Sequence, residues 1–404
     1  MDLKSGYPYW AVKNGLMQAF PPLQAHLRCE VAIIGGGITG ALIADELAAH
    51  GHEVAVIEQR DVGWGSSSAS TALLQYEIDT HMIDLAKRYG EADAVLAYGK
   101  CAEALGLLQD KARDIRDVDF GWMDSLYYAS KPRHAKVLRD EFALRLRHGL
   151  RVELLERDEL QGRYGIDSPV AILSHQAARI DPYRMAYRVL ARLQKRGSSV
   201  LDRTRIESIQ ATSRGVVLRT TEGHTIRAHH LVLAAGYANQ KWLKKKVAQN
   251  RSSYAFITDP IDDQALGQLK GTMVWESARP YLYMRSTGDG RLLVGGEDDS
   301  VDVPSKRDAR VEKKARTLSR KVAGLFPHLP LAPAFAWAGT FAETRDGLPF
   351  FGAHPQHGQR VHFAMAYGGN GITYSMLGAG LLRASIEKRK HPLRALFGFG
   401  RLDR

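Results

Sequence analysis

The feature of the sequence that most constrains the fold is a glycine-rich turn between two segments of different periodicity. Gly35, Gly37 and Gly40 stand in the spacing G-x-G-x-x-G. The turn follows a short apolar run, residues 31–34, which is typical of a buried parallel strand. It precedes residues 38–49, whose apolar positions recur at helical spacing. This pattern predicts a strand, a tight turn and a helix at the start of an α/β fold.

A second apolar run, residues 53–57, completes the unit and ends at Glu58. The first glycine of the motif permits the tight turn, the second lets the backbone approach a pyrophosphate, and the third lets the helix pack close to the strand. The N–H groups at the start of the helix then face the phosphates. Glu58 stands where an acid accepts hydrogen bonds from ribose hydroxyls. The sequence therefore predicts a dinucleotide-binding β-α-β unit.

Composition narrows the class of protein. The chain has 404 residues, of which 45% are hydrophobic and 25% charged, which excludes a disordered or fibrous chain. The net charge of +12 raises a nucleic-acid hypothesis. The basic residues are spread over several expected helices, with no nucleic-acid motif among them, so nucleic acid is disfavoured as a partner.

The cysteine count and the hydropathy of the chain indicate where in the cell the protein is expected. Two cysteines, Cys29 and Cys101, are too few for a disulfide framework, and the scattered histidines show no ligand spacing, so no metal site is expected. No apolar stretch reaches eighteen residues, and the first residues lack the apolar core of a signal peptide. We therefore expect a cytoplasmic protein without a membrane span.

Further along the chain, helices are expected within residues 82–115 and 133–148, and a strand over 120–129. Asp181 is placed to cap a helix that begins at Pro182. The remaining expected elements are four short strands before Ala234, a hairpin that turns at Gly288-Asp289-Gly290, a strand over 362–366 and a terminal helix that ends near Lys388.

Several separated motifs, in this order, resemble the D-amino-acid oxidase / glycine oxidase superfamily of FAD-dependent oxidoreductases. The resemblance extends from about Glu30 to Arg404 and rests on VAIIGGGITG with Glu58, VGWGSSS, RIDPYRM, LVLAAG and DGLPFFG followed by YGGNGIT. The segment YLYMRSTGDGRLLVGGED is most similar to the amine / γ-glutamylputrescine oxidase branch.

The resemblance implies a Rossmann-type FAD-binding domain interrupted by a mixed-sheet α+β substrate domain. The expected FAD-binding segments are 28–77, 176–240 and 337–404, the substrate-binding segments are 78–175 and 241–336, and residues 1–27 form an N-terminal extension.

The resemblance also implies a set of FAD-binding residues spread over seven segments. In the first glycine-rich turn and the acidic segment they are Gly35, Gly37, Ile38, Thr39, Gly40, Glu58, Gln59 and Arg60. In the following loop they are Trp64, Gly65, Ser66, Ser67, Ser68 and Thr71. In the rest of the chain they are Ile206, Ala235, Gly236, Gly339, Gly369, Asn370, Gly371, Ile372 and Thr373. The helix expected after Asn370 would direct its positive end at negative charge that develops on the flavin.

Three departures from the family pattern shape the expected chemistry. Residues 64–71 and 338–340 contain no cysteine or histidine, so FAD is expected to be non-covalent. Phe341 stands where α-amino-acid oxidases of the group have an arginine that pairs the substrate carboxylate. Leu293 stands where sarcosine-oxidase-like members place a lysine for oxygen activation, which weakens the expectation of O2 as electron acceptor without excluding it.

The resemblance implies oxidation of a C–N bond by hydride transfer to flavin N5, which gives an imine that water hydrolyses. Strand alternation places Tyr283 and Arg285 on one face of the hairpin with Tyr281, and with Tyr254 behind them they are the candidate catalytic residues. The acids that follow, residues 297–299, could hold a cationic amine or a polyamine tail, although a solvated loop is the simpler interpretation.

Three hypotheses about function remain open. The first is an oxidoreductase for a small amine or secondary amine, with O2 or another electron acceptor. The second is an α-amino-acid oxidase or dehydrogenase whose carboxylate anchor is Arg285 or Arg345. The third, suggested by the charge, is an FAD-dependent enzyme that modifies nucleic acid.

Overall fold

The glycine-rich turn forms the predicted β-α-β unit in the computed structural model, which describes residues 3–365 and 367–403. Strand β2 (Leu27–Ile34) leads into helix α2 (Ile38–Ala49), and β3 (Val54–Ile57) pairs parallel to β2. A Cβ atom on Gly40 would lie 1.9 Å from the carbonyl oxygen of Gly35. Only glycine at position 40 therefore lets the helix lie this close to the turn.

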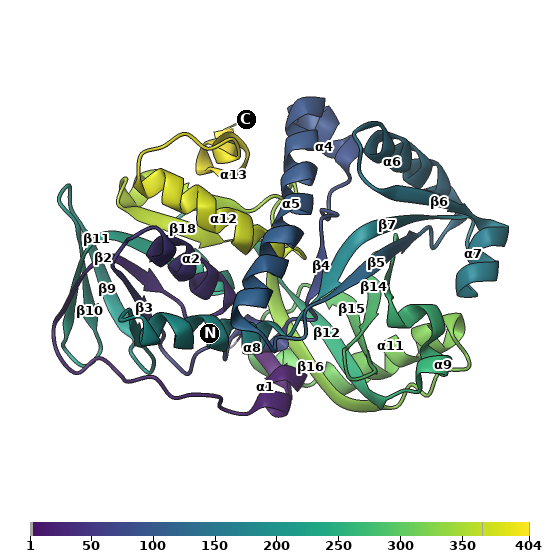
Figure 1. Ribbon diagram of the computed structural model, residues 1–404, viewed down its shortest axis with the longest axis horizontal. Helices are drawn as coiled ribbons and strands as arrows, with labels where there is room; N and C mark the ends of the chain where they lie inside the picture. Colours follow the sequence, from purple (N-terminus) through teal and green to yellow (C-terminus); the bar gives the residue numbers. More distant parts are fainter. Residues whose placement is uncertain (1–2, 366, 404) are drawn as a thin grey trace.

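Within the described residues, the β-α-β unit belongs to an eight-stranded sheet, called here the smaller sheet (Figure 1). Its strand order is β17-β18-β11-β2-β3-β8, and β10 and β9 continue from β11. The further bounds are β8 (Ser199–Leu201), β9 (Ile206–Ala211), β10 (Val216–Thr220), β11 (Thr225–Leu233), β17 (Phe350–Ala353) and β18 (Val361–Met365). Helix α2 packs between α8 (Pro182–Lys195) and α12 (Gly371–Ile386), and the three cover one face of this sheet.

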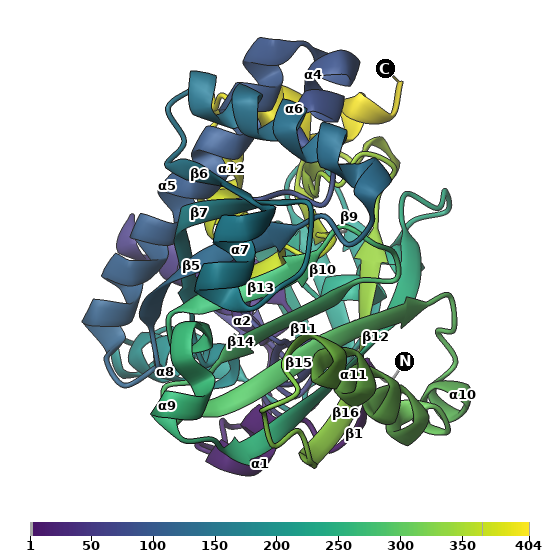
Figure 2. The same cartoon turned by 90° about the vertical axis from the view of Figure 1, so that its right-hand side faces the viewer.

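The second sheet of the described chain, the larger sheet, has ten strands in the order β1-β16-β12-β15-β14-β13-β5-β7-β4, and β6 pairs with β7. Its first strands are β1 (Lys4–Gly6), β4 (Leu73–Gln75), β5 (Gly121–Tyr128), β6 (Val152–Glu156) and β7 (Val170–Arg179). The others are β12 (Gln249–Pro260), β13 (Thr272–Glu276), β14 (Leu282–Ser286), β15 (Arg291–Asp299) and β16 (Pro333–Glu343). Helix α11 (Val311–Leu325) packs across β12, β15 and β16, as Figure 2 shows.

The long helix α5 (Glu91–Ile115) joins the two halves, because it contacts α8 and α12 on one side and β4 and β7 on the other. The remaining helices lie around the two sheets. They are α1 (Tyr9–Asn14), α3 (Ser66–Ala69), α4 (Met82–Tyr89), α6 (Ala135–Arg147), α7 (Arg157–Tyr164), α9 (Asp263–Leu266), α10 (Pro304–Asp308) and α13 (Arg394–Phe397). Short 3-10 helices occur at 132–134, 236–242, 267–270, 355–357 and 399–403.

Most of the expected elements are present with small changes of boundary. The carboxylate of Asp181 accepts a hydrogen bond from the backbone N–H of Arg184 at 2.9 Å, which is the predicted cap of α8. The predicted helical region 82–115 is divided at Gly90, whose φ of +91° interrupts it. The predicted hairpin forms from β14 and β15 around residues 288–290.

Strand pairing divides the chain at other points than the expected segment boundaries. Strands β4, β7 and β16 extend into segments assigned to the FAD-binding part, yet all three belong to the larger sheet. Residues 1–27 include β1, which pairs with β16, and α1, whose Trp10 is fully buried. The division into two domains stays a prediction. A division by strand pairing would assign β1, β4, β7 and β16 to the part that contains the larger sheet.

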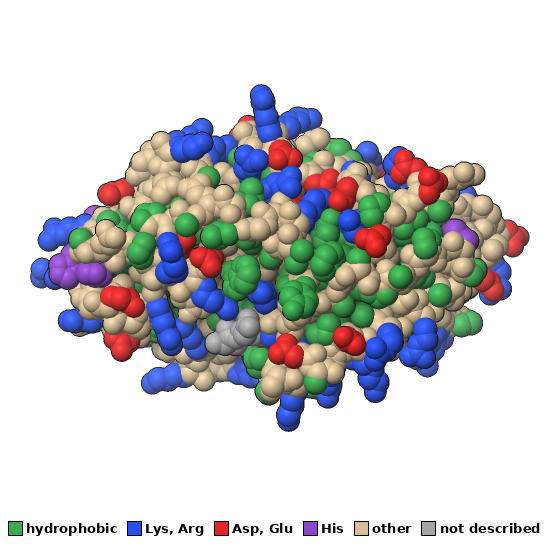
Figure 3. All heavy atoms as spheres, turned by 90° about the horizontal axis from the view of Figure 1, so that it is seen from below, with side chains coloured by type: hydrophobic (Ala, Val, Ile, Leu, Met, Phe, Trp, Pro, Cys, Tyr) green, Lys and Arg blue, Asp and Glu red, His purple; other side chains and the backbone are tan. Residues whose placement is uncertain are grey.

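The basic side chains do not gather in one patch on the face shown in Figure 3. Lys and Arg are distributed around this face, with Asp and Glu among them. Among the described residues, no helix is both long and apolar enough to cross a membrane.

Substitution of Gly40 tests the close packing of α2. The Gly40→Ala variant should lower the free energy of unfolding by about 2–3 kcal/mol, because the new methyl group meets a backbone oxygen that cannot turn away. Calorimetric Tm and the FAD content of the purified protein report the effect. Gly106→Ala in α5 is the matched control, since nothing lies within 4 Å of its Cβ, and it should stabilise the protein by about 0.5–1 kcal/mol. Equal Tm values for the two variants would contradict the packing argument.

Candidate active site

Residues from both sheets line one long cavity. Its walls come from the glycine-rich turn, residues 58–75, the start of α12 and one face of the larger sheet. The space amounts to about 1910 Å³, open mouth included. Because its walls extend from the glycine-rich turn to the larger sheet, one continuous cavity joins the expected dinucleotide site to the face of that sheet.

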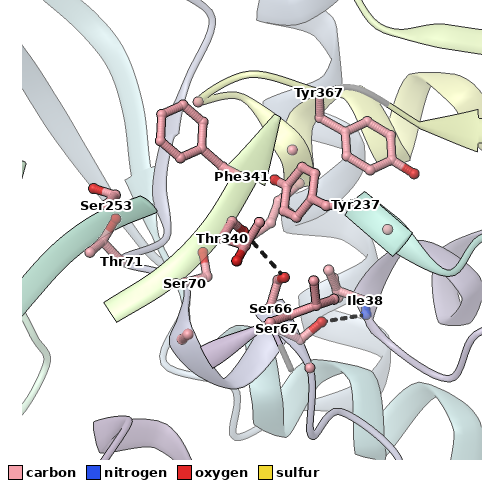
Figure 4. A pocket seen from close by; sticks show the side chains of 18 of the residues that line it. Ile38, Ser66, Ser67, Ser70, Thr71, Tyr237, Ser253, Thr340, Phe341 and Tyr367 are labelled. Atoms are coloured by element: carbon pink, nitrogen blue, oxygen red, sulfur yellow. Dashed lines mark hydrogen bonds between the residues drawn. The ribbon is translucent and has the colours of Figure 1, made fainter. Parts of the chain in front are cut away.

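The first part of the cavity is a backbone cradle around the glycine-rich turn. Glu58 accepts hydrogen bonds from the N–H of Gly36 at 2.9 Å and the N–H of Arg60 at 3.0 Å, so its carboxylate is fixed at the end of β3. The hydroxyl of Ser67 accepts from the N–H of Ile38 at 2.9 Å (Figure 4). Gly35, with a φ of +119°, passes so close to Ala234 that a Cβ would lie 2.4 Å from its carbonyl oxygen.

The second part is the loop that contains α3, which runs against β16. The Ser66 hydroxyl donates to the Thr340 carbonyl at 3.4 Å, and the two residues face each other in Figure 4. A Cβ on Gly339 would lie 3.2 Å from the Cβ of Ala69, so small residues on both sides let the loop approach the strand. Further along, Thr71 lies beside Ser253 of β12.

The third part is the start of α12. The Asn370 amide donates to the carbonyls of Glu77 at 2.8 Å and Gln75 at 3.3 Å, and the Thr373 hydroxyl donates to Gln75 at 3.1 Å. These bonds tie the helix to the segment after β4 and hold its N-terminal end at the cavity. The partial positive charge at this end suits a group that becomes more negative when it is reduced.

Most of the residues expected to bind FAD line this cavity. They are Gly35, Gly37, Ile38, Thr39, Glu58, Gln59, Arg60, Gly65, Ser66, Ser67, Thr71, Ala235, Gly236, Gly339, Gly369, Asn370, Gly371, Ile372 and Thr373. Four others do not line it. Gly40 serves the helix packing described above, and the Ser68 hydroxyl donates to the Gly65 carbonyl at 2.9 Å. The Trp64 ring is 38% exposed under the ammonium of Lys4, and Ile206 is buried against the smaller sheet.

The cradle fits FAD. The exposed backbone of the glycine-rich turn and the N-terminus of α2 suit the phosphates of FAD, and the N-terminus of α12 suits its ring system. Glu58 suits a ribose. None of the described residues that line the cavity is a cysteine or a histidine. Both cysteines are buried elsewhere as free thiols.

Beyond the cradle, the larger sheet and the segment after β4 form a second compartment with aromatic walls and acidic groups. The aromatic residues are Trp275, Tyr281, Tyr283 and Phe341, and the acids are Glu77, Asp79, Asp298 and Glu343. The Tyr283 ring packs directly on Gly295, where a Cβ atom would lie 2.3 Å from a ring carbon. The Tyr283 hydroxyl is 2.9 Å from the Ser253 hydroxyl.

Burial dominates the electrostatics of these acids. It raises the pKa of Asp298 to about 7, and it also raises the pKa values of Asp79 and Glu77 above the ordinary carboxyl range. Asp79 accepts a hydrogen bond from the backbone N–H of Gly369 at 2.8 Å, which partly offsets the cost of burying its charge. Glu343 differs because Arg251 and Arg279 both pair with it, Arg279 at 3.3 Å.

The geometry places the side chains of two of the three candidate catalytic residues, Arg285 and Tyr254, outside the second compartment. Arg285 is fully buried away from the cavity, and its guanidinium donates to the carbonyls of Thr71, Ile180 and Ser286 at 2.8, 3.1 and 3.0 Å. Burial lowers its pKa to about 10. Its strand face was predicted correctly, but the side chain lies beyond the end of the cavity, under Trp10.

Tyr254 is part of the cavity wall, yet its side chain turns to the opposite face of the sheet. Its hydroxyl donates to Asp299 at 3.1 Å, and its ring packs in the apolar cluster beneath α11. Arg345, the other proposed carboxylate anchor, is exposed and is not among the described lining residues. Of the candidate catalytic residues, Tyr283 alone presents its side chain to the compartment.

Four residues of this compartment had no role in the sequence interpretation, namely Glu77, Asp79, Trp275 and Glu343. For Glu343 a signal existed, because residues 337, 339, 341 and 343 all line the cavity from alternate positions of β16. No comparable signal marks Asp79, which reaches the site only because α12 packs against the segment after β4.

A dinucleotide cradle that opens into an aromatic compartment is typical of an oxidoreductase with a nucleotide cofactor. The chain belongs to the FAD dependent oxidoreductase family, whose model matches residues 30–384.

Among curated relatives, the chain is 25% identical to gamma-glutamylputrescine oxidoreductase of Escherichia coli K12 over 395 residues, which cover 94% of this chain and 89% of the relative. It is 27% identical to glycine oxidase of Geobacillus kaustophilus over 375 residues, which cover 90% and 94%. The cofactor is therefore FAD, and the predicted α/β fold class and family resemblance are confirmed.

Solved structures show the same fold. The crystal structure of the Geobacillus kaustophilus glycine oxidase superposes with a TM-score of 0.76 at 22% identity and covers 92% of this chain and 98% of that one. L-proline dehydrogenase from P. horikoshii gives 0.79 at 19% identity, with 94% and 99% covered.

The cavity lining predicts that FAD dissociates when the protein unfolds. After acid precipitation, the yellow colour should stay in the supernatant and the pellet should be colourless, because no described lining residue offers a thiol or imidazole for a flavin bond. Flavin absorbance of the two fractions measures this. A yellow pellet that survives washing in denaturant would show a covalent bond.

Proposed function

We propose that this enzyme oxidises a C–N bond of a small cationic amine. The observation that carries the proposal is the second compartment, where Phe341 replaces a guanidinium with an apolar ring and Asp79 and Asp298 supply negative charge. An ammonium is attracted by buried carboxylates and by aromatic faces, whereas the carboxylate of an α-amino acid is repelled by the same acids.

Bound FAD supplies an acceptor for the hydrogen and electron pair that leave the carbon next to nitrogen, so the substrate C–N bond becomes C=N. Water then adds to the imine carbon, and an aldehyde or ketone and the free amine or ammonia leave. The chain's own contribution is to bind the amine, orient its C–H bond and exclude water before the oxidation. Trp275, Tyr281 and Phe341 form the apolar walls for this purpose.

An ammonium must lose a proton before its C–H bond can break in this way. Asp298 is a suitable acceptor, because it lines the compartment and burial raises its pKa to about 7. At neutral pH it is present in both forms, which favours proton exchange. The Tyr283 hydroxyl, held by Ser253, is positioned to orient the nitrogen.

Two further features belong to the proposal. The acceptor that reoxidises the enzyme is O2 or another oxidant, and Leu293, fully buried in the apolar core, offers no cationic group to assist oxygen. A cytoplasmic location is supported by the two free thiols, Cys29 and Cys101.

The α-amino-acid alternative keeps one supporting observation. Arg279 lies at the rim of the compartment, half-exposed, with its guanidinium 4.6 Å from the centre of the Tyr281 ring. It could receive a carboxylate if it left Glu343. The proposed amine function does not require this movement.

Anaerobic bleaching of the flavin distinguishes the two functions. Holoenzyme mixed with primary amines, secondary amines and α-amino acids should lose its flavin absorbance with amines at least about tenfold faster than with amino acids of equal size. Stopped-flow absorbance at saturating and limiting substrate measures the rates. Bleaching by α-amino acids alone would overturn the amine proposal and support the alternative.

Phe341 should control this preference. The Phe341→Arg variant places a guanidinium in the wall, and because a buried charge-assisted pair contributes about 1.5–3 kcal/mol, the rate ratio of amino acids to amines should rise about 10- to 100-fold. Phe341→Leu, which keeps the wall apolar, is the control and should keep the amine preference. An unchanged ratio in Phe341→Arg, with normal FAD content, would contradict this role.

A further inference from the structure

Three consecutive acids at the end of β15 point to opposite sides of the larger sheet. Glu297 pairs with Lys314 at 3.3 Å and Lys321 at 2.7 Å, and Asp299 pairs with Arg310 at 2.8 Å. These cations all belong to α11 or to the turn before it. The outer two acids are therefore neutralised on the α11 side.

Asp298, between them, faces the cavity and has no such partner. Its Oδ1 is buried and makes no hydrogen bond within the described residues. A buried carboxylate oxygen without a partner is costly to the protein. Such an oxygen in the wall of a substrate compartment indicates a group that receives its partner from the ligand.

Asp79 is a second carboxylate that lines the compartment. It accepts the single N–H of Gly369, and a Cβ on Gly368 would lie 2.7 Å from its Oδ2, so the two glycines make room for it. The cation that acts on both carboxylates is Arg279, which lowers both pKa values from a distance while it pairs with Glu343 at 3.3 Å. Both carboxylates raise the pKa values of Tyr281 and Tyr283, which places this pair of rings within reach of both.

The compartment therefore offers two carboxyl groups that form no ion pair among the described residues, with the Tyr281 and Tyr283 rings near both. A monoamine can pair with one of these carboxyl groups, and an amino acid brings a repelled carboxylate. A molecule with two ammonium groups on an alkyl chain can neutralise both and pack its methylene groups against Tyr281 and Tyr283.

We propose that the substrates of this enzyme are aliphatic diamines or polyamines, whose second ammonium is held by one of the paired carboxylates, Asp79 and Asp298, while the other receives the amine to be oxidised. This inference rests on the proposed amine function and adds the substrate class. The amine oxidised loses a hydride to FAD as described above, and the second ammonium does not react.

Binding to reduced holoenzyme tests the inference without turnover. Under anaerobic conditions, dithionite-reduced enzyme cannot oxidise an amine, so calorimetry measures affinity alone. The probes are the α,ω-diamines of three to six carbons, each compared with the monoamine and the ω-amino acid of equal chain length. The best diamine should bind at least tenfold more tightly than its monoamine, and the ω-amino acid should bind most weakly.

Variants identify the groups responsible. Asp298→Asn and Asp79→Asn should each reduce the preference for diamine over monoamine to less than about threefold, while flavin absorbance and FAD content remain those of the wild type. Glu297→Gln is the matched control, because the neighbouring acid faces α11, and it should keep the full preference. Wild-type enzyme that binds a diamine no better than its monoamine, or a preference that survives in both aspartate variants, would overturn the inference.

The same ligands separate this inference from the proposed function. If monoamines bleach the flavin anaerobically as fast as diamines do, the amine function stands and the diamine inference is wrong. If only α-amino acids bleach it, both are wrong.

Discussion

The close approach of α2 to the turn after β2 is the constraint on which the rest of the site depends. Because Gly40 carries no side chain, the helix begins directly over Gly35, and its first N–H groups reach the cavity. Glu58 can then bond to the backbone of Gly36, and Ser67 to that of Ile38. The loop of residues 63–75 is held against the turn by these contacts and carries the chain on to Asp79 and the substrate compartment.

Strand alternation then separates structural from chemical residues in the larger sheet. Glu297 and Asp299 pair with cations beside α11, and Tyr254 joins them through its hydroxyl. Asp298 and Tyr283 face the cavity from neighbouring strands. Side chains one position apart therefore have opposite functions, because successive residues of a strand point to opposite faces. The amine chemistry proposed here depends on this separation.

Short sequence motifs predicted those parts of the site whose geometry depends on residues close together in the sequence. The glycine spacing, the acid at the end of β3 and the Asp181 cap are all confirmed by the backbone hydrogen bonds around them. The position of Arg285 was not predictable from local signals. Alternation gave its face correctly, but the depth of the cavity along β14 is set by α1, whose Trp10 covers the guanidinium.

The sequence by itself determined the β-α-β unit, because that unit rests on short-range rules for glycine and strand periodicity. The family and the expected FAD-binding residues came from the resemblance of several separated motifs to known proteins. Only the tertiary structure decided which charged groups share the substrate compartment. Asp79, Asp298 and Glu343 come from three distant segments, and their partners come from others. Whether a carboxylate is neutralised or left for a ligand depends on which cations pack within about 4 Å of it, and long-range packing alone fixes that distance.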